Sequence, residues 1–590
     1  MSAVPPIPLP LPAPPPDALA KYLQTASSDR KQSQATELVH TALNRYTFGH
    51  TPQGDSYAVA NGSHLAVALR GNGSLRGELA QTYFQAHKRA ASSQALADAM
   101  ATLDGYARNG APVDTSLRVA VQDGARWVDM GTPTGEVIRL DAKGWTIGGT
   151  APVWFARTVL TGPMPTPTPG GDIDRLWQVV NVAEPDRPLI LAWLVAALAF
   201  PDVAHPVLIL AGEQGAAKST ATRALANLVD PSTTGPRTPP REPEQWVTSC
   251  QASWIVALDN LSRLSDWMSD AICRAVTGDA DVKRRLYTDG EPVLFRFRRA
   301  VILNGISLDT LRGDLADRAL RVNLPRIGQG ERCNDTDIDQ MIRAAHPAIL
   351  GGLLDLAVRV LANPVALDQK PRMADYAEIL AAVDQQLGTN GQAQYANTAQ
   401  AMAADSLADD RFVTEVMSQL TQPWQGTAAD LLANVTVPDG ATRAQLDWPK
   451  SPAKVSDKLG RKAPAMRSMG WQVDNDGGRN HLKVRRWELT PPEKGGKTPP
   501  QYPQYPLSQV TGLKPAGEVS PQCPRSVPAV PAGENALTRQ CGDSGDSGGQ
   551  KPAISGGDQV CTDCAAPLDQ GAIENGYTVC WPCHPDNPKN

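Results

Sequence analysis

The 590-residue chain lacks a long hydrophobic run, a signal-like start and an excess of either charge. Its longest apolar run, Pro188–Phe200, is shorter than the ~20 residues that cross a bilayer. The N-terminus is rich in proline and lacks the basic residues of a signal peptide. With 56 Lys and Arg against 61 Asp and Glu, the composition excludes a uniformly basic, histone-like binder. These absences predict a cytoplasmic protein without a membrane segment, whose nucleic-acid contacts would come from local basic patches.

Cysteine is scarce outside the C-terminal tail, whereas proline and glycine are abundant. The cysteines outside the tail are scattered and odd in number, which argues against the disulfide framework of a secreted domain. The 51 Pro and 49 Gly exceed what packed domains use, so tails and linkers are expected. At ~150 residues per domain, the length indicates about four folded units.

Composition and periodicity divide the chain into segments. We predict a disordered Pro-rich tail over 1–30, an N-terminal α+β domain of unknown role over 31–162, a P-loop ATPase domain over 172–365, a helical and winged-helix DNA-binding region over 366–490, a disordered linker over 491–557 and a zinc ribbon over 558–590. In the N-terminal domain the pattern favours a helix from 81 to 106 and strands near 118–121, 127–130 and 136–140. Between 172 and 365 helices alternate with short apolar strands, which is typical of a three-layer α/β fold with a mostly parallel sheet.

A phosphate-binding loop is predicted between an apolar strand, 207–211, and a helix, 220–229. Main-chain N–H groups of such a loop and of the helix N-terminus converge on an anion. Lys218 would neutralise the β- and γ-phosphates of ATP, and the Ser219 hydroxyl would bind Mg²⁺. The predicted ATP-binding residues are Gly212, Glu213, Gln214, Gly215, Ala216, Ala217, Lys218, Ser219 and Thr220. Ala217 replaces the usual Gly before the Lys, where a positive φ would cost energy. A chance strand–loop–helix turn is the alternative.

Two further apolar strands are expected to end in polar residues that serve the same nucleotide. Asp259 closes the strand 253–259 and would hold Mg²⁺ through water, together with Ser219. Asn304 closes the strand 299–304 and is suited to contact the γ-phosphate or the attacking water. Each signal is weak alone, since many core strands end in Asp and an Asn readily starts a turn.

One position departs from a typical ATPase. Asn260 follows Asp259 where many such enzymes place a Glu that polarises the attacking water, and this puts the rate of hydrolysis in question. Asp266 and Asp270 are candidate substitutes, although each would equally suit a solvated position on a helix.

Two arginines, Arg318 and Arg321, follow the strand that ends in Asn304. An arginine supplied across a subunit boundary stabilises transition-state charge on a neighbour's nucleotide, and Arg318 is the favoured residue for this role. A surface salt bridge with Asp314 or Asp317 is the simpler alternative. The predicted catalytic residues are therefore Lys218, Asp259, Asn304 and Arg318.

Taken in order, these segments resemble superfamily 3 helicases, most closely the primase–helicases of phages and mobile elements. The resemblance rests on Gly212–Ser219, Leu258-Asp259, Thr277-Gly-Asp279, Lys283–Asp289, Leu303-Asn304 and Asp317-Arg318, and it covers roughly residues 190–325. It implies an AAA+-type P-loop ATPase, a homo-hexameric ring, ATP-driven translocation on single-stranded DNA and DNA-contacting hairpins that face the pore. Asn260 departs from the acidic pair common in the family, and no acidic pair or zinc element upstream marks a primase.

The segment 281–300 favours a DNA contact independently of the resemblance. Basic residues outnumber acidic ones there, aromatic residues lie between them, and two strand-like pieces flank Asp289-Gly290. Basic groups would follow the phosphates while an aromatic ring stacks on a base. The DNA-binding candidates are Lys283, Arg284, Arg285, Tyr287 and Arg298. An edge hairpin kept soluble by its charge is the alternative.

Residues 450–488 form a second basic region. A helix from Ser451 to Met469, a turn at 475–478 and a strand at 482–489 indicate a winged helix that would bind duplex DNA, with Arg485 and Arg486 as candidate contacts. A protein-contact module with a solvated basic face fits the pattern nearly as well.

The C-terminal tail carries the sharpest single motif. Cys561-Thr-Asp-Cys564 and Cys580-Trp-Pro-Cys583 supply four thiolates, the ligand set of a closed structural Zn²⁺ site. So short a fold depends on its metal. Redox-active thiols, a chance pairing, or His584 in place of Cys583 are the alternatives. Such a ribbon would bind either DNA or a partner protein.

The sequence thus predicts a modular DNA-dependent ATPase that uses ATP, Mg²⁺ and Zn²⁺, above all a replicative helicase of phage or mobile-element type. Two other classes fit the same residues. One is an ATP-switched initiator or loader that binds DNA without unwinding it. The other is a degenerate nucleotide-binding scaffold, kept open by Ala217 and Asn260, whose work is done by the basic module and the zinc ribbon.

Overall fold

The computed structural model describes residues 33–492, except for short gaps. The gaps are 72–73, 262–263, 279, 285–291, 306–310, 312, 329, 331, 409, 439–441, 444–445, 447 and 478–484. All described residues belong to one compact unit, Met1–Cys523. The Pro-rich tail, the linker and the zinc ribbon that we predicted lie outside the described residues, so they stay predictions.

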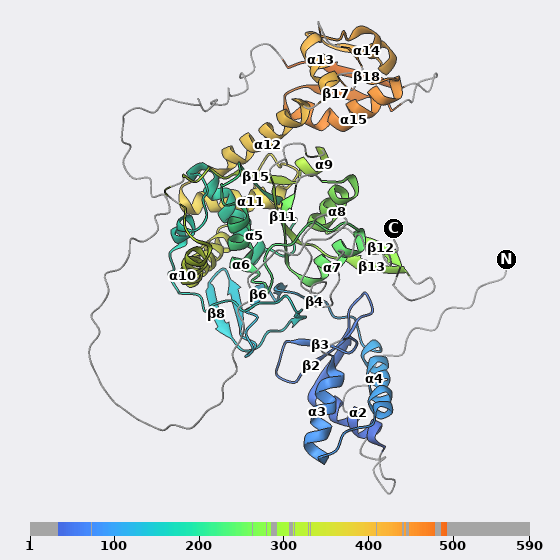
Figure 1. Ribbon diagram of the computed structural model, residues 1–590, viewed down its shortest axis with the longest axis vertical. Helices are drawn as coiled ribbons and strands as arrows, with labels where there is room; N and C mark the ends of the chain where they lie inside the picture. Colours follow the sequence, from blue (N-terminus) through green and yellow to red (C-terminus); the bar gives the residue numbers. More distant parts are fainter. Residues whose placement is uncertain are drawn as a thin grey trace, which may run out of the picture. The chain divides into compact units, whose positions relative to one another are not determined.

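The first folded segment combines three helices with a small antiparallel sheet (Figure 1). Its elements are α2 (Gln34–Arg45), β1 (Tyr46–His50), β2 (Ser56–Ala60), β3 (Ala66–Ala68), α3 (Leu75–His87) and α4 (Ser93–Arg108). Leu38, Leu79 and Leu103 pack together in its core. The single helix predicted over 81–106 is wrong: Lys88 adopts φ 55 and ends α3, so the chain forms two helices.

A second antiparallel sheet follows, with strand order β5-β6-β7-β8. It comprises β5 (Val119–Gln122), β6 (Ala125–Asp129), β7 (Val137–Asp141) and β8 (Gly144–Gly148), flanked by the short pair β4 (Thr115–Ser116) and β9 (Trp154–Phe155). The three strands predicted near 118–140 are confirmed. Val128 and Ile138 share one core with helices of the next region, and Trp145 donates a hydrogen bond of 2.8 Å to Asp355. This sheet therefore shares its hydrophobic core with the helices of the central region.

The central region is a parallel four-stranded sheet between layers of helices (Figure 1). The strands are β11 (Ile255–Leu261), β14 (Ala300–Gly305), β10 (Val207–Ala211) and β15 (Ala319–Asn323), in that spatial order. Alternate residues of β10 enter different cores, Leu208 and Leu210 on one face and Val207 and Ile209 on the other. This two-sided burial confirms the mixed α/β fold with a parallel sheet.

Helices cover both faces of this sheet. They are α5 (Arg187–Ala199), α6 (Lys218–Val229), α7 (Pro243–Ala252), α8 (Asp266–Thr277), α9 (Gly313–Ala316), α10 (Asp335–Ala362), α11 (Ala374–Leu387) and α12 (Gly391–Ala408), after the 3-10 turns η1 (Ile173–Gln178) and η2 (Glu184–Asp186). The apolar run 188–199 is the buried core of α5. Among the described residues only α10 is long and apolar enough to cross a membrane, and most of its apolar window is packed inside the protein.

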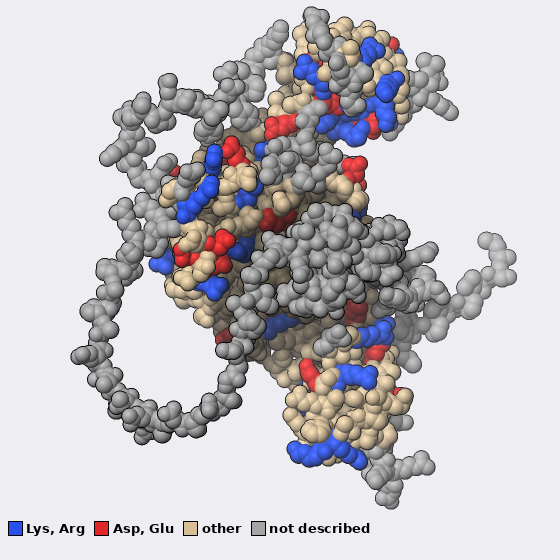
Figure 2. Space-filling view, viewed as in Figure 1, with Lys and Arg blue, Asp and Glu red and all other residues tan. Residues whose placement is uncertain are grey.

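The last folded segment has the element order of a winged helix. It contains α13 (Arg411–Gln419), β16 (Trp424–Thr427), α14 (Ala428–Asn434), α15 (Pro452–Ser468), β17 (Gln472–Asn475) and β18 (Arg486–Thr490), with the antiparallel order β16-β18-β17. Ser451 caps the predicted helix, as its hydroxyl accepts from the Lys454 N–H. Phe412, Trp448 and Trp487 fill the core. Figure 2 shows Lys and Arg side chains gathered over this segment.

Candidate nucleotide-binding site

The loop between β10 and α6 has the backbone of an anion-binding turn. Gly212, Gly215 and Ala217 all have positive φ, with values of 147, 87 and 58. At Gly212 a Cβ atom would lie 2.7 Å from the Leu324 carbonyl oxygen, so only glycine fits. Ala217 adopts the left-handed conformation that costs an L-residue about 1 kcal/mol or more. Ala217 thus has the positive φ that a glycine would adopt without this cost.

Lys218 begins α6 and folds back over this loop. Its Nζ donates hydrogen bonds to the carbonyl oxygens of Gly212 (2.7 Å) and Glu213 (2.8 Å). Burial lowers the pKa of the Lys218 ammonium, and the nearby Asp259 carboxylate opposes that shift. The ammonium is thus held at the centre of the turn, where it can neutralise a phosphate.

Ser219 and Asp259 meet beside the loop, as predicted for the two magnesium ligands. The Ser219 hydroxyl donates to Asp259 Oδ1 at 2.9 Å. They meet because Ser219 starts the helix that follows β10, while Asp259 lies near the carboxyl end of β11. A hydroxyl and a carboxylate oxygen at one point form the start of an oxygen-ligand set that fits Mg²⁺.

Asn304 links α6 to the end of β11. Its amide Oδ1 accepts from the Asn260 N–H at 3.0 Å, and its Nδ2 donates to the Thr222 hydroxyl at 2.7 Å. The side chain is buried, with 1% exposed. Both ends of the amide are used within the chain, so Asn304 positions its neighbours here, and a direct contact with phosphate or water stays a prediction.

Asn260 differs from the expected Glu for a conformational reason. Its φ is 58, at a bulge of β11 between Leu258 and Leu261. Asn adopts this left-handed conformation more readily than Glu. Of the proposed substitutes, Asp266 starts α8 and Asp270 lies within the same helix.

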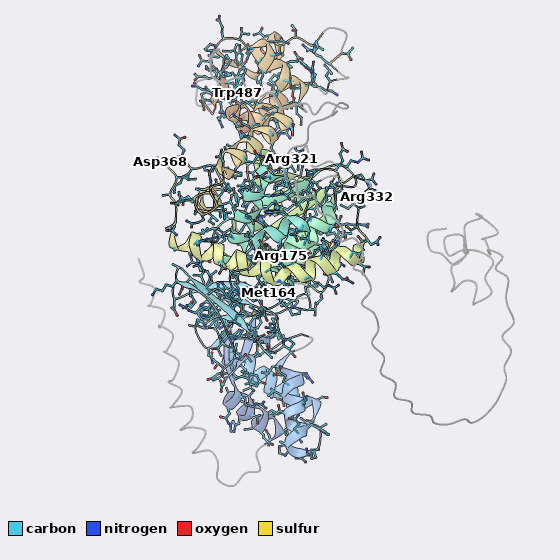
Figure 3. The ribbon with its side chains drawn as sticks, turned by 90° about the vertical axis from the view of Figure 1, so that its left-hand side faces the viewer. Met164, Arg175, Arg321, Arg332, Asp368 and Trp487 are labelled. Atoms are coloured by element: carbon cyan, nitrogen blue, oxygen red, sulfur yellow. The ribbon has the colours of Figure 1, made fainter. Side chains whose placement is uncertain are left out.

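A cavity of about 280 Å³ adjoins the loop on the side of Ala217 and Thr220. Apolar residues of its lining are Val179, Ile327, Ile338 and Met341, and the polar ones include Asn181 and Asp335. Apolar walls next to an anion-binding turn suit the base and ribose of a nucleotide. Arg332 also lines this cavity, and Figure 3 shows it on the rim of the α/β core. No spacing rule in the sequence pointed to these residues.

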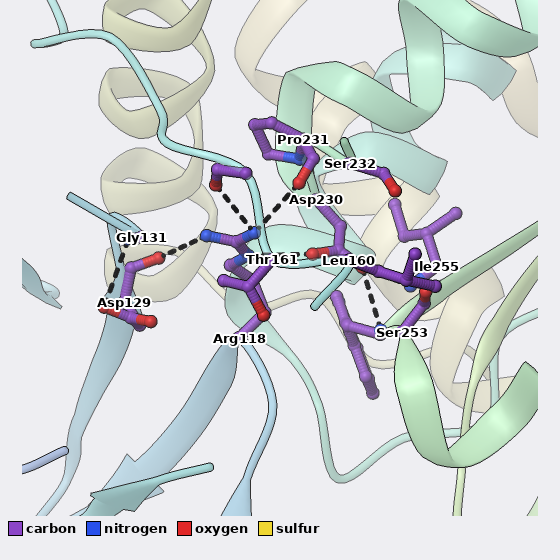
Figure 4. Close-up of polar contacts among 12 residues, drawn as sticks. Arg118, Asp129, Gly131, Leu160, Thr161, Asp230, Pro231, Ser232, Ser253 and Ile255 are labelled. Atoms are coloured by element: carbon purple, nitrogen blue, oxygen red, sulfur yellow. Dashed lines mark hydrogen bonds and ion pairs between the residues drawn. The ribbon is translucent and has the colours of Figure 1, made fainter. Parts of the chain in front are cut away.

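A buried polar cluster holds the opposite ends of α6 and β11 (Figure 4). Arg118, which directly precedes β5, has 0% exposure, and its Nε donates to Asp230 Oδ1 at 2.8 Å. The Arg118 Nη atoms donate to the carbonyl oxygens of Asp129, Gly162 and Pro231. Asp230 ends α6, and its Oδ2 accepts from the N–H groups of Trp254 and Ile255 at the start of β11.

Arg118 thus joins three elements that are distant in sequence. The cluster fixes the C-terminal end of α6 and the start of β11. Ser219 and Asp259 lie at the opposite ends of the same two elements. A lone arginine within a strand pattern gave no sign of this role, because its partner follows more than a hundred residues later.

Arg318 is engaged within its own chain. Its guanidinium pairs with Asp314, the simpler alternative considered above, and only 13% of its side chain is exposed. Burial raises the pKa of the Asp314 carboxyl, whereas the hydrogen bond from Arg318 lowers it. The pKa of Asp314 is lowered overall. Arg372 lies 3.3 Å from the same carboxylate, and Arg321 pairs with Asp405 at 2.9 Å. A role across a subunit boundary would require the Arg318–Asp314 pair to open.

The predicted hairpin is present in the backbone. β12 (Ala280–Arg284) pairs antiparallel with β13 (Pro292–Arg296). The structure describes only the main chain of Lys283 and Arg284, and Arg285 and Tyr287 lie outside the described residues. Arg298 does not point to solvent as a DNA contact would: its guanidinium donates to the main-chain oxygens of Asp202 and Thr277. It anchors the base of the hairpin.

The basic residues of the winged-helix segment divide into two groups. Lys458 pairs with Asp410 at 2.9 Å, and Lys462 donates to the Ser406 carbonyl at 2.6 Å, so both hold α15 against neighbouring helices. Among the described residues from 450 to 490, the exposed basic side chains are Lys450, Lys454, Arg461, Arg467, Arg485 and Arg486. The structure therefore leaves the candidates Arg485 and Arg486 accessible.

The zinc prediction lies outside the described residues, since all four cysteines, Cys561, Cys564, Cys580 and Cys583, belong to the tail. Within residues 33–492, gaps excepted, no group of three or more His, Cys, Asp or Glu side chains is placed to hold a metal.

Two family models match the chain in succession. Residues 173–410 match the actinomycete integrative conjugative element replication protein, and residues 411–504 match the C-terminal domain of the RepA protein of these elements. The first match contains the loop, Asp259, Asn304 and the hairpin, and the second begins with α13. Neither description names superfamily 3. A search of curated proteins gives no match.

Two solved structures share a distant likeness. Cch of SCCmec type IV, described as an active helicase, has a TM-score of 0.38 at 13% identity, over 76% of this chain and 93% of its own. The apo A form of the NrS-1 C-terminal region has a TM-score of 0.34 at 11% identity, over 78% of this chain and all of its own. At these scores neither likeness bears on function.

Proposed function

We propose that this chain is a replication protein of an actinomycete integrative conjugative element, like the two families whose models match residues 173–410 and 411–504, and that it acts as an ATP-hydrolysing, helicase-type motor on single-stranded DNA. The observation that carries the proposal is the contact between Ser219 and Asp259 beside Lys218. In a P-loop ATPase these three side chains serve one nucleotide and its Mg²⁺.

The chain's own residues suggest how such a site would work. N–H groups of the loop and of the α6 N-terminus would hold the phosphates, with Lys218 between them. Ser219 and Asp259 would hold Mg²⁺, which when bound neutralises the phosphate oxygens. The cavity beside Thr220 would receive the base and ribose. Asn304 of β14 is hydrogen-bonded to both Asn260 and Thr222. A movement of β11 near the Mg²⁺ ligand Asp259 would therefore be transmitted to β14 and α6.

DNA binding is supported by the position of the hairpin and by the exposed basic residues. β13 ends at Arg296, and β14, which carries Asn304, begins at Ala300. A change at the nucleotide could therefore move the hairpin along a short path. We further propose a hexameric ring in the cytoplasm, in which Arg318 leaves Asp314 and reaches a neighbour's nucleotide, while the basic face of the winged helix contacts duplex DNA.

The test is steady-state ATP turnover with and without single-stranded DNA. We expect Mg²⁺-dependent turnover in the wild type, raised at least several-fold by DNA, and loss of both in Lys218→Ala. Lys370→Ala is the matched control, since this surface lysine of the same region pairs only with Glu378 among the described residues and should leave turnover unchanged. Turnover that survives in Lys218→Ala would refute the proposed site.

A second function is favoured by two specific observations. Asn260 supplies no acid to polarise water, and Arg318 is held by Asp314. Both suit an ATP-switched initiator or loader that binds DNA without unwinding it. A forked-duplex assay separates the two: a motor displaces the strand in step with ATP turnover, whereas a switch gives nucleotide-dependent binding and no displacement.

A further inference from the structure

The segment that leaves β15 crosses the phosphate-binding loop before α10 begins. The Leu324 N–H donates to the Ala211 carbonyl at 2.8 Å, at the end of β10. The Asn181 side chain donates to the Pro325 carbonyl at 2.6 Å, and the Ile327 N–H approaches the Gly215 carbonyl at 3.4 Å. These contacts fix the course of the segment over the loop.

Arg332, the residue three positions before α10, lies directly against that loop. A Cβ atom built on Gly215 would be 2.9 Å from Arg332 Nη2. The arginine lines the same cavity as Ala217 and Thr220. Its side chain is exposed, and within the described part of the chain no residue forms a salt bridge or hydrogen bond with it. A guanidinium thus lies at an anion-binding turn, and none of the described residues accepts a hydrogen bond from it.

Its position differs from those of Lys218 and Arg318, the other two cations considered for nucleotide binding. Lys218 occupies the centre of the turn, and Arg318 is tied to Asp314. Arg332 lies against Gly215 of the loop and lines the same cavity as the apolar residues Ile327 and Met341. The part of a nucleotide that would span this gap joins the base to the phosphates, so the nearest anionic groups are the α- and β-phosphates.

We infer that Arg332 binds the α- and β-phosphates of the nucleotide in cis, an inference that rests on the proposed ATP site. A guanidinium offers paired donors to phosphate oxygens, which makes it a stronger partner there than an ammonium. Because these phosphates are present in both ADP and ATP, Arg332 strengthens the binding of both nucleotides equally. It therefore lowers KM and leaves kcat nearly unchanged, whereas an arginine that acts only in the transition state changes kcat.

The experiment measures the Kd of Mg²⁺–ADP and Mg²⁺–ATP, and kcat and KM for ATP, with the full-length protein. The variants are Arg332→Ala, Arg332→Lys, Lys218→Ala and the control Arg326→Ala. Arg326 carries the same charge on the same segment and is exposed, but it does not line the cavity. We expect Arg332→Ala to weaken both nucleotides by roughly tenfold to a hundredfold. Arg332→Lys should be intermediate, and Arg326→Ala should match the wild type.

The possible results distinguish a failure of the Arg332 inference from a failure of the proposed ATP site. If the wild type binds nucleotide, Lys218→Ala loses binding and Arg332→Ala binds as the wild type does, the role of Arg332 is overturned while the ATP site stands. An effect on ATP alone, or on kcat with KM unchanged, also overturns it. If the wild type binds neither nucleotide, the proposed function itself fails.

Discussion

The two ends of the α6–β11 pair differ sharply. At one end Ala217 and Asn260 adopt left-handed conformations, Lys218 is bonded to carbonyl oxygens of its own loop, and the Ser219–Asp259 contact is open to solvent. At the other end Arg118 is fully buried, and its three side-chain nitrogens all donate to oxygen atoms.

This difference shows how the fold divides its tasks. The buried end uses long-range hydrogen bonds to fix the distance between α6 and β11. The loop end carries backbone strain and cationic groups that a bound anion would satisfy. A rigid support behind an adaptable loop is what a site that must bind and release a ligand requires.

Breaking the buried end should have the largest effect on stability. Arg118→Met leaves Asp230 and three carbonyl groups short of a donor inside the protein, and we expect a loss of about 3–5 kcal/mol in the free energy of unfolding. Arg139→Met, in strand β7 and with 45% of its side chain exposed, should cost about 1 kcal/mol or less. Denaturant titration followed by circular dichroism measures both. Equal losses would contradict the account.

Acid should destabilise the buried end next. Burial lowers the pKa of His205, which packs on Trp254, and of His346 in α10 from 6.5 to about 4. Between these values the unfolded chain binds more protons than the folded one, so stability is lost as pH falls from about 6.5 towards 4. The total is on the order of a few kcal/mol, from 1.36 kcal/mol per pKa unit.

Thermal unfolding midpoints measured from pH 7.5 to 4.5 test this dependence. His205→Gln removes one of these two histidines and should flatten the curve over this range. A curve as steep as that of the wild type would count against the histidine as its cause.

At the loop end, stability and ligand binding should separate. Lys218→Ala should leave the free energy of unfolding within about 1 kcal/mol of the wild type, because among the described residues the Lys218 side chain hydrogen-bonds only to its own loop. Mg²⁺–ATP at a hundred times its Kd should stabilise the wild type by about 2.7 kcal/mol and the variant not at all. Differential scanning fluorimetry with and without nucleotide gives both values, and nucleotide stabilisation of the variant would contradict the site.

The smallest effect on stability is expected from relieving the backbone strain at Ala217. Ala217→Gly should stabilise the protein by up to about 1 kcal/mol, the left-handed penalty less the greater chain entropy of glycine. Lys88→Gly is the matched control, since Lys88 has φ 55 at the end of α3, away from the loop. Both should gain stability, and neither should lose nucleotide binding. A loss of stability in Ala217→Gly would mean that the loop is not strained there.

The sequence could predict features that are local or that follow from parallel strands. The strand, loop and helix around Lys218 are contiguous, and Asp259 and Ser219 meet because the carboxyl ends of parallel strands share one edge of a sheet. The helix capped by Ser451 and the hairpin of β12 and β13 could also be predicted, because each depends on residues close together in the sequence. Periodicity did not reveal the break at Lys88, because a turn set by one positive φ leaves the helical pattern almost intact.

Features that depend on tertiary contacts could not be predicted. Arg298 appeared to be one of several basic residues of a DNA-binding hairpin, and only the fold shows its bonds to Asp202 and Thr277. Arg118 and Arg332 are single arginines without a motif, and their roles come from elements brought beside them by folding. Asn260 looked like a lost catalytic acid, whereas its backbone conformation gives a structural reason for the amide.

The central claim is that nucleotide bound at the Lys218 loop changes the affinity of the protein for DNA. The most direct measurement is the Kd of a labelled single strand, by fluorescence anisotropy, with and without a non-hydrolysable Mg²⁺–ATP analogue. We predict a change of at least several-fold in the wild type and none in Lys218→Ala. The same Kd in all four conditions would contradict both the motor and the switch.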